Sequence, residues 1–188
     1  MVPHVGSLIA QRFQPLEAAR PGFPIKARDL ASAQTVVLHA VADFDRRLIG
    51  IFHPSLLAIF DVVNHDGQWF AACEFVPAQS LEHLLAGMLW HPRRAAEIGA
   101  EVADATAELH ARGLAHGHIS PATVLVTAKG KAKLSIIAAD TGSDAQADVQ
   151  ALQRLVEEIA GKRPPAIEQT DSAAVLAAAL RGTLVRNL

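Results

Sequence analysis

The feature that most constrains the fold is a change of pattern near Val76, Pro77 and Ala78. Before this point, apolar and β-branched residues come in short runs separated by turn signals, which is typical of strands. Five strands are predicted, with a tight hairpin turn at Asp66-Gly67 and one short helix at residues 43–51. The strands are expected at residues 12–18, 23–28, 34–41, 56–63 and 68–75.

After Pro77 the sequence becomes rich in alanine and predicts helices. The longest is expected at residues 93–112, ended by Gly113, with a buried face of Ile98, Val102, Ala105 and Leu109. Ser80 is expected to cap a shorter helix before it. A hairpin of residues 123–126 and 131–137, turning at Lys129-Gly130, precedes a helix at 147–160 closed by Gly161 and Pro164-Pro165. A last helix, 171–180, is expected to be capped by Asp171.

Composition limits the kinds of partner. A chain of 188 residues that is 51% hydrophobic can bury a substantial core, and the fold class expected is α+β. A net charge of -2 and the lack of a basic cluster argue against binding to nucleic acid or to a membrane. Cys73 is the only cysteine, so no intrachain disulfide is possible, and a cytoplasmic location is expected.

Several motifs resemble those of protein kinases, most closely the bacterial serine/threonine family. They occur in the family's order from about residue 12 to 165, and residues 109–126 are the most specific stretch because they resemble the catalytic loop with its flanking helix and strand. The others are His53-Pro54-Ser55-Leu56-Leu57, Cys73-Glu74-Phe75-Val76, Ser80-Leu81 and Asp148-Val149.

The resemblance implies one minimal two-lobed kinase-like domain over residues 1–188. Its N-lobe, residues 1–76, would be a five-stranded antiparallel sheet with a short αC helix. A hinge at 74–79 would lead to a mainly helical C-lobe, residues 80–188. Only nine residues separate Ala138 from Asp148, too few for the family's activation segment.

In the N-lobe, the resemblance places unsuitable residues at the nucleotide-binding positions. Glu17 and Ala19 occupy the first two positions of the glycine-rich loop, and only Gly22 is retained. His39 replaces the phosphate-binding lysine, and Phe44 stands near the position of its glutamate partner. Apart from Gly22, the vestigial cleft would consist of Cys73 at the gatekeeper position, Glu74 and Val76.

In the C-lobe, the polar groups of phosphoryl transfer are replaced together. His116 is retained, whereas the positions of the arginine, aspartate, lysine and asparagine hold Gly117, His118, Ser120 and Thr123. The magnesium-binding triplet falls on Ile136-Ile137-Ala138, which has no carboxylate. A second alignment places the triplet on Asp140-Thr141-Gly142 and restores one ligand. Asp148 is expected to accept hydrogen bonds from the loop backbone.

These replacements predict a pseudokinase that acts as a scaffold or allosteric regulator in bacterial signalling. Its partner would be another protein, such as an active kinase or a signalling domain, and ATP and magnesium are not expected to bind well. Two alternatives remain: residual nucleotide binding or phosphoryl transfer with His118 as base, and a metal site of His110, His116 and His118. Trp69, Trp90 and Phe60 are expected in the core.

Overall fold

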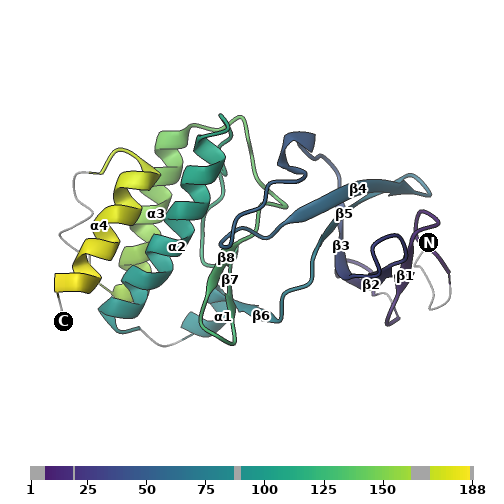
Figure 1. Cartoon of the computed structure of the whole chain (residues 1–188), viewed down its shortest axis with the longest axis horizontal. Helices are drawn as coiled ribbons and strands as arrows, with labels where there is room; N and C mark the ends of the chain where they lie inside the picture. The colour runs from purple at the N-terminus through teal and green to yellow at the C-terminus, as the bar shows by residue number, and fades with distance from the viewer. Residues whose placement is uncertain (1–6, 19, 87–89, 162–169, 187–188) are drawn as a thin grey trace. The chain divides into compact units, whose positions relative to one another are not determined.

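The computed structural model describes residues 7–18, 20–86, 90–161 and 170–186. It divides into two compact units (Figure 1). The first consists of Met1–Phe52 and Leu57–Val76, and the second of His53–Leu56 and Pro77–Leu188. The division falls at Val76 and Pro77, where the sequence changes from strand-like to helical patterns.

The first unit is a curled five-stranded antiparallel sheet with the strand order β1-β2-β3-β5-β4. Asp66 and Gly67 both have positive φ, so the predicted tight turn between β4 and β5 is confirmed. The predicted strands are confirmed with shifted ends. Their bounds are β1 Phe13–Pro15, β2 Ile25–Asp29, β3 Thr35–Val41, β4 Ile59–His65 and β5 Gln68–Glu74.

One face of this sheet forms a hydrophobic core. Side chains alternate across a strand, so every second residue of β2 is buried, as are Val36 and Leu38 of β3. The core is closed by an ionic contact: the Arg12 guanidinium donates both to Asp29, at 2.8 and 2.9 Å, and to Asp61 at 2.7 Å. Its main buried residues are Ile9, Phe13, Ile25, Ala27, Val36, Leu38, Phe70 and Ala72.

The segment between β3 and β4 is less helical than predicted. It contains only one 3-10 turn, η1, at Arg46–Leu48, with Asp45 as its N-cap. The predicted helix over residues 43–51 was therefore too long, because only Leu48 and Ile51 of this segment are buried enough to anchor it. The expectation for Trp69 was also wrong: its side chain is 40% exposed, and the Arg46 guanidinium lies 5.5 Å from its ring centroid.

The second unit contains four α-helices within the described part of the chain. The helix α2 packs against both α3 and α4 (Figure 1). A Cβ atom at Gly99 of α2 would lie 2.4 Å from a methyl carbon of Val156, so the glycine lets α3 approach closely. The bounds are α1 Leu81–Leu85, α2 Pro92–His110, α3 Ala145–Ala160 and α4 Ala173–Arg186. None of the helices described is long and apolar enough to span a membrane.

The predicted hairpin is part of a three-stranded sheet, ordered β6-β7-β8. The strands are β6 Ala78–Ser80, β7 Val124–Thr127 and β8 Ala132–Leu134. The strand β6 was not predicted, because three residues carry too little alternation to be recognised without their partner. The segment His53–Leu56 belongs to this unit because Leu56 forms a parallel bridge with Leu134.

Most of the predicted helix ends are confirmed. The Ser80 hydroxyl accepts from the His83 amide, and Gly161 ends α3 in the left-handed conformation. Pro164 and Pro165 lie outside the described residues. At the start of α4 the predicted Asp171 cap is replaced by Ser172, whose hydroxyl accepts from the Val175 amide.

Candidate functional site

The candidate site is the loop that follows α2, residues 111–123, which resembles a kinase catalytic loop. Gly113 has a φ of 68°, and the Leu114 amide donates to the Leu109 carbonyl at 3.0 Å, so the chain turns sharply at the helix end. Leu114, Ala115 and Ile119 are buried and anchor the loop to the core. The polar residues between these anchors therefore have defined positions.

Asp148 holds the loop from the first turn of α3. Its side chain is 1% exposed, and its two oxygens accept from the backbone amides of His116 and Gly117 at 2.7 and 2.8 Å. The His110 Nε2 lies 2.9 Å from the same carboxylate and donates to it. Burial by itself raises the pKa of Asp148, but these three donors outweigh it and leave the pKa below its usual value. The expected hydrogen bonds from the loop backbone are therefore confirmed.

His116 is buried in a neutral form. Its Nε2 lies 2.8 Å from the Ser135 carbonyl and must donate, while its Nδ1 accepts from the His118 amide at 3.2 Å. Burial is the main reason that the pKa of His116 is lowered. This ring connects the loop to the segment after β8 and has no free nitrogen for chemistry.

Thr123 closes the other end of the loop. Its hydroxyl accepts from the Ser120 amide at 3.0 Å and lies within 3.1 Å of the carbonyls of His118 and Ser120, to either of which it can donate. The Thr123 hydroxyl, which the resemblance aligns with a metal-binding asparagine, is thus used within the loop itself. Ser120 takes part through its backbone.

His118 is an exposed residue in the middle of this loop. Its amide donates to the His116 ring, and the hydrogen bonds described above that hold the loop do not use the His118 ring. The rings of His110 and His116 bond instead to Asp148 and Ser135. In the described part of the chain, no group of three or more His, Cys, Asp or Glu side chains is arranged to hold a metal ion. The three histidines therefore do not form a metal centre there.

The triplet that the resemblance aligns with a magnesium-binding motif is apolar at its first residue. Ile136 is 0% exposed and belongs to the core, while Ala138 is exposed. Asp140, the alternative candidate, is also exposed, and its carboxylate accepts from the Gly142 amide at 3.3 Å. The Asp140 amide donates to the His116 carbonyl at 2.9 Å, so the segment turns back directly onto the loop.

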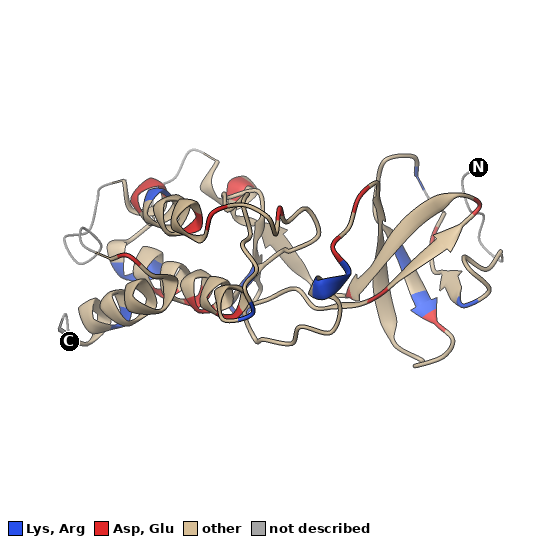
Figure 2. Ribbon diagram, turned by 90° about the horizontal axis from the view of Figure 1, so that it is seen from above, with Lys and Arg blue, Asp and Glu red and all other residues tan. Residues whose placement is uncertain are grey.

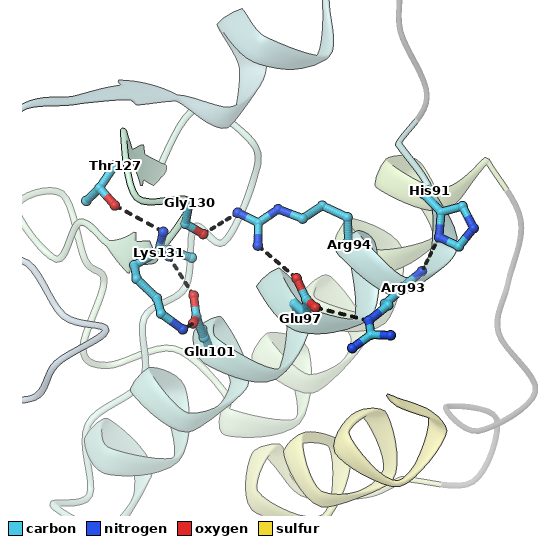
Figure 3. A network of polar contacts seen from close by, with 9 residues as sticks. His91, Arg93, Arg94, Glu97, Glu101, Thr127, Gly130 and Lys131 are labelled. Atoms are coloured by element: carbon cyan, nitrogen blue, oxygen red, sulfur yellow. Dashed lines mark hydrogen bonds and ion pairs between the residues drawn. The ribbon is translucent and has the colours of Figure 1, made fainter. Parts of the chain in front are cut away.

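The hairpin after the loop is fixed to α2 by a polar network that the sequence did not reveal (Figure 3). The Arg94 guanidinium donates to the Gly130 carbonyl and to Glu97, the latter at 2.9 Å. The Glu101 carboxylate accepts from the Lys131 ammonium at 2.7 Å and from the Ala132 amide at 2.6 Å. Periodicity could not pair these residues because about 30 positions separate Glu101 from Lys131.

In the first unit, the predicted cleft residues lie on or beside the sheet. Gly22 has a φ of 78°, and His39 is half-buried on β3, where burial lowers the pKa of its ring. Cys73 on β5 is fully buried, and burial raises its pKa to about 12. Glu74 accepts from the Ala58 amide at 2.9 Å. Val76 is half-buried at the end of this unit.

Two comparisons with known proteins bear on the family. No protein-family model matches the chain. A curated relative, the serine/threonine-protein kinase PrkC of Bacillus subtilis, is 27% identical over 84 residues. The match covers 44% of this chain and 13% of the kinase. This partial similarity supports a relationship to serine/threonine kinases.

Proposed function

We propose that this chain is a pseudokinase, a kinase-like protein without phosphoryl-transfer activity, which works by binding another protein as a scaffold or allosteric regulator in signalling. The observation that carries the proposal is the buried Ile136 at the position of the magnesium-binding aspartate. An isoleucine side chain offers no oxygen to a metal ion, and its place in the core leaves no room for a carboxylate with its hydration.

The use of the remaining polar groups supports the same proposal. Asp148 and His116 direct their polar atoms to the loop backbone or to a neighbouring carbonyl, and the Thr123 hydroxyl does the same. Kinase chemistry depends on side chains directed at phosphates, metal ions and the acceptor hydroxyl. A loop whose hydrogen bonds hold its own shape is suited to presenting a surface to a partner.

The kind of partner is inferred from charge and compartment. Acidic and basic residues are interspersed along the helices of the second unit (Figure 2), which gives no extended field for a polyanion. A protein partner, such as an active kinase or a signalling domain of a bacterial cytoplasm, fits this mixed surface best.

A second candidate function rests on one observation, the exposed His118 ring at the position of the catalytic base. Histidine is the side chain that most often serves as a general base in enzymes. The candidate activity is an unconventional phosphoryl transfer, or residual nucleotide binding, that uses the other retained features of the loop.

One experiment separates the two functions. Purified protein is incubated with radiolabelled ATP and either magnesium or manganese, with general protein substrates, alongside the His118→Ala variant. The pseudokinase proposal expects no transfer above a protein-free blank for either protein, and no change of melting temperature with ATP and metal. Transfer that disappears in His118→Ala would establish the second function and overturn the first.

The scaffold part of the proposal needs its own test. Proteins that co-purify from the source organism are identified, produced separately and titrated against the purified chain by calorimetry. A defined one-site complex whose affinity is unchanged by ATP and magnesium is the expected result. If no purified candidate binds below about 100 μM, a range in which contacts lack the energy of a specific interface, the scaffold function is rejected.

A further inference from the structure

The 3-10 turn η1 holds the backbone of Arg46 in a defined place on the first unit. The Asp45 carboxylate accepts from the Arg47 amide at 2.9 Å, and the Ile49 amide donates to the Arg46 carbonyl at 3.2 Å. Leu48, at the end of the turn, is buried and anchors it. The exposed Arg46 side chain therefore starts from a fixed point.

The ring of Trp69 gives the Arg46 side chain a platform. Trp69 lies on β5, which pairs with β3 on one side and with β4 on the other, so its backbone is fixed as well. The Arg46 guanidinium lies over the ring, 5.5 Å from its centre. A guanidinium stacked on an aromatic ring keeps the N–H groups at its edge available, and these match a carboxylate in two parallel hydrogen bonds.

Arg46 differs from its neighbour in having no acidic partner. The Arg47 guanidinium donates to both oxygens of the Asp45 carboxylate, at 3.1 and 2.6 Å, so its charge is compensated. Across the residues that the structure describes, the guanidinium of Arg46 takes part in no hydrogen bond or ion pair. Its donors are therefore available to an acceptor from outside the chain.

A small cavity lies beside the Arg46 and Trp69 side chains. Its volume is about 160 Å³, which suits one side chain of a few carbon atoms. Sites for whole small-molecule ligands are larger, at about 300–1,000 Å³. Val41 and Val62, both buried, supply the apolar part of the lining. The cavity is therefore suited to an apolar side chain that comes next to a group bound by Arg46.

The charges around the cavity favour a ligand with one carboxylate. Asp43 lines the same cavity, and its carboxylate accepts from the Phe44 amide at 2.8 Å. A second acidic group on the ligand would be repelled by Asp43. A single guanidinium cannot hold a polyanion such as nucleic acid, whose binding needs several cations.

We propose that Arg46, Trp69 and the cavity beside them form a docking site for a protein partner, which binds through a segment with one carboxylate next to a small apolar side chain. The edge of the Arg46 guanidinium holds the carboxylate, and the apolar side chain enters the cavity against Val41 and Val62. Arginine and tryptophan are enriched among the residues that carry the energy of protein interfaces. The site rests on the proposed function, because it names the kind of partner and the surface that binds it.

The test uses the peptide acetyl-Gly-Glu-Val-Gly-amide as the probe. It is titrated into the full chain carrying Trp90→Phe, while the indole N–H of Trp69, then the only tryptophan, is followed by NMR. This signal should shift in a saturable way, with a dissociation constant of about 1–10 mM. The same peptide with glutamine for glutamate should bind about tenfold more weakly, since it loses the charge-assisted bonds. No saturable shift up to about 20 mM, or equal binding of the two peptides, would overturn the proposal.

Matched variants show whether Arg46 itself holds the probe. Arg46→Gln should weaken binding about tenfold, whereas Arg28→Gln, which removes an equal charge from an exposed position on β2, should change it less than about twofold. Arg46→Lys keeps the charge without the planar fork and should bind about threefold more weakly or worse. An equal loss in Arg46→Gln and Arg28→Gln would indicate a general charge effect and would refute the site.

A purified partner separates the docking site from the scaffold function. Binding of a partner to wild type and to Arg46→Gln with equal affinity would leave the scaffold function standing and refute the site. Binding that is about tenfold weaker in Arg46→Gln and unchanged in Arg28→Gln would support both.

Discussion

Replacing Asp148 by alanine should destabilise the second unit strongly. The substitution leaves the amides of His116 and Gly117 buried without an acceptor and removes the partner of His110. A buried amide without a partner costs about 1–3 kcal/mol, so the two amides together predict a loss of about 4 kcal/mol. Asp148→Asn keeps one oxygen acceptor and should lose about 2 kcal/mol. Both losses are large beside the total stability of about 5–15 kcal/mol for an ordinary domain.

The two tryptophans allow this effect to be measured in one unit at a time. Trp69 lies in the first unit and Trp90 in the second, and the chain has no others. In a Trp69→Phe background, urea unfolding followed by tryptophan fluorescence therefore reports on the second unit alone. Asp140→Asn is the matched control, because Asp140 is an exposed carboxylate in the same region, and it should change the stability by less than about 0.5 kcal/mol.

The pH dependence provides an independent check of the same reasoning. The pKa of Asp148 is lower in the folded chain than in the unfolded chain. Its contribution to stability is therefore complete above the unfolded pKa of about 4 and is lost as the pH falls through the folded pKa. The difference between wild type and Asp148→Asn should shrink at acidic pH. A stability for Asp148→Asn within about 0.5 kcal/mol of wild type at pH 7 would refute the bracing role of this carboxylate.

Three further predictions concern other buried groups. Arg12→Met leaves the buried Asp29 without its cation and should cost the first unit about 3 kcal/mol, measured by urea unfolding with Trp69 fluorescence in a Trp90→Phe background. Because Arg12 is the main cause of the lowered pKa of Asp29, this loss of stability should fade below about pH 4. An unchanged urea midpoint would contradict the prediction. Burial raises the pKa of Cys73 to about 12, so its thiol should resist a disulfide exchange reagent in the native protein and react rapidly in urea. Rapid reaction in the native protein as well would contradict this prediction. His116 has a lowered pKa, so the stability of the second unit, followed by Trp90 fluorescence in a Trp69→Phe background, should decline as the pH falls below about 6.5, where the unfolded chain gains the proton. The decline between about pH 6.5 and 5 should be smaller in His116→Gln, and an identical decline in both proteins would exclude His116 as a source.

Local features of the sequence were sufficient to predict much of the fold. The short apolar runs that predicted β2 and β3, the Asp66-Gly67 turn and the Ser80 and Gly161 caps each depend on neighbouring residues, and each is confirmed. Element ends were predicted less well. The last helix continues to Arg186 rather than 180, because packing against α2 extends it beyond what its own residues indicate.

Part of the candidate site was also predictable. The resemblance of residues 109–126 to a kinase catalytic loop was enough to expect the bond between Asp148 and the loop backbone. The exposure of Trp69 was not predictable, because it depends on how little of the sheet the segment around η1 covers. The sequence likewise gave no indication that His110 donates to Asp148, since a histidine at a helix end has many possible partners.

The sequence by itself determined which residues make up the loop after α2 and where the chain turns, since both are properties of neighbouring residues. Only the tertiary structure decided that Gly117 lies beneath residues 138–143, that β6 joins a sheet and that Arg94 ties the hairpin to α2. These contacts join residues far apart in the chain. Their geometry follows from the packing of the whole unit, which no local pattern of side chains records.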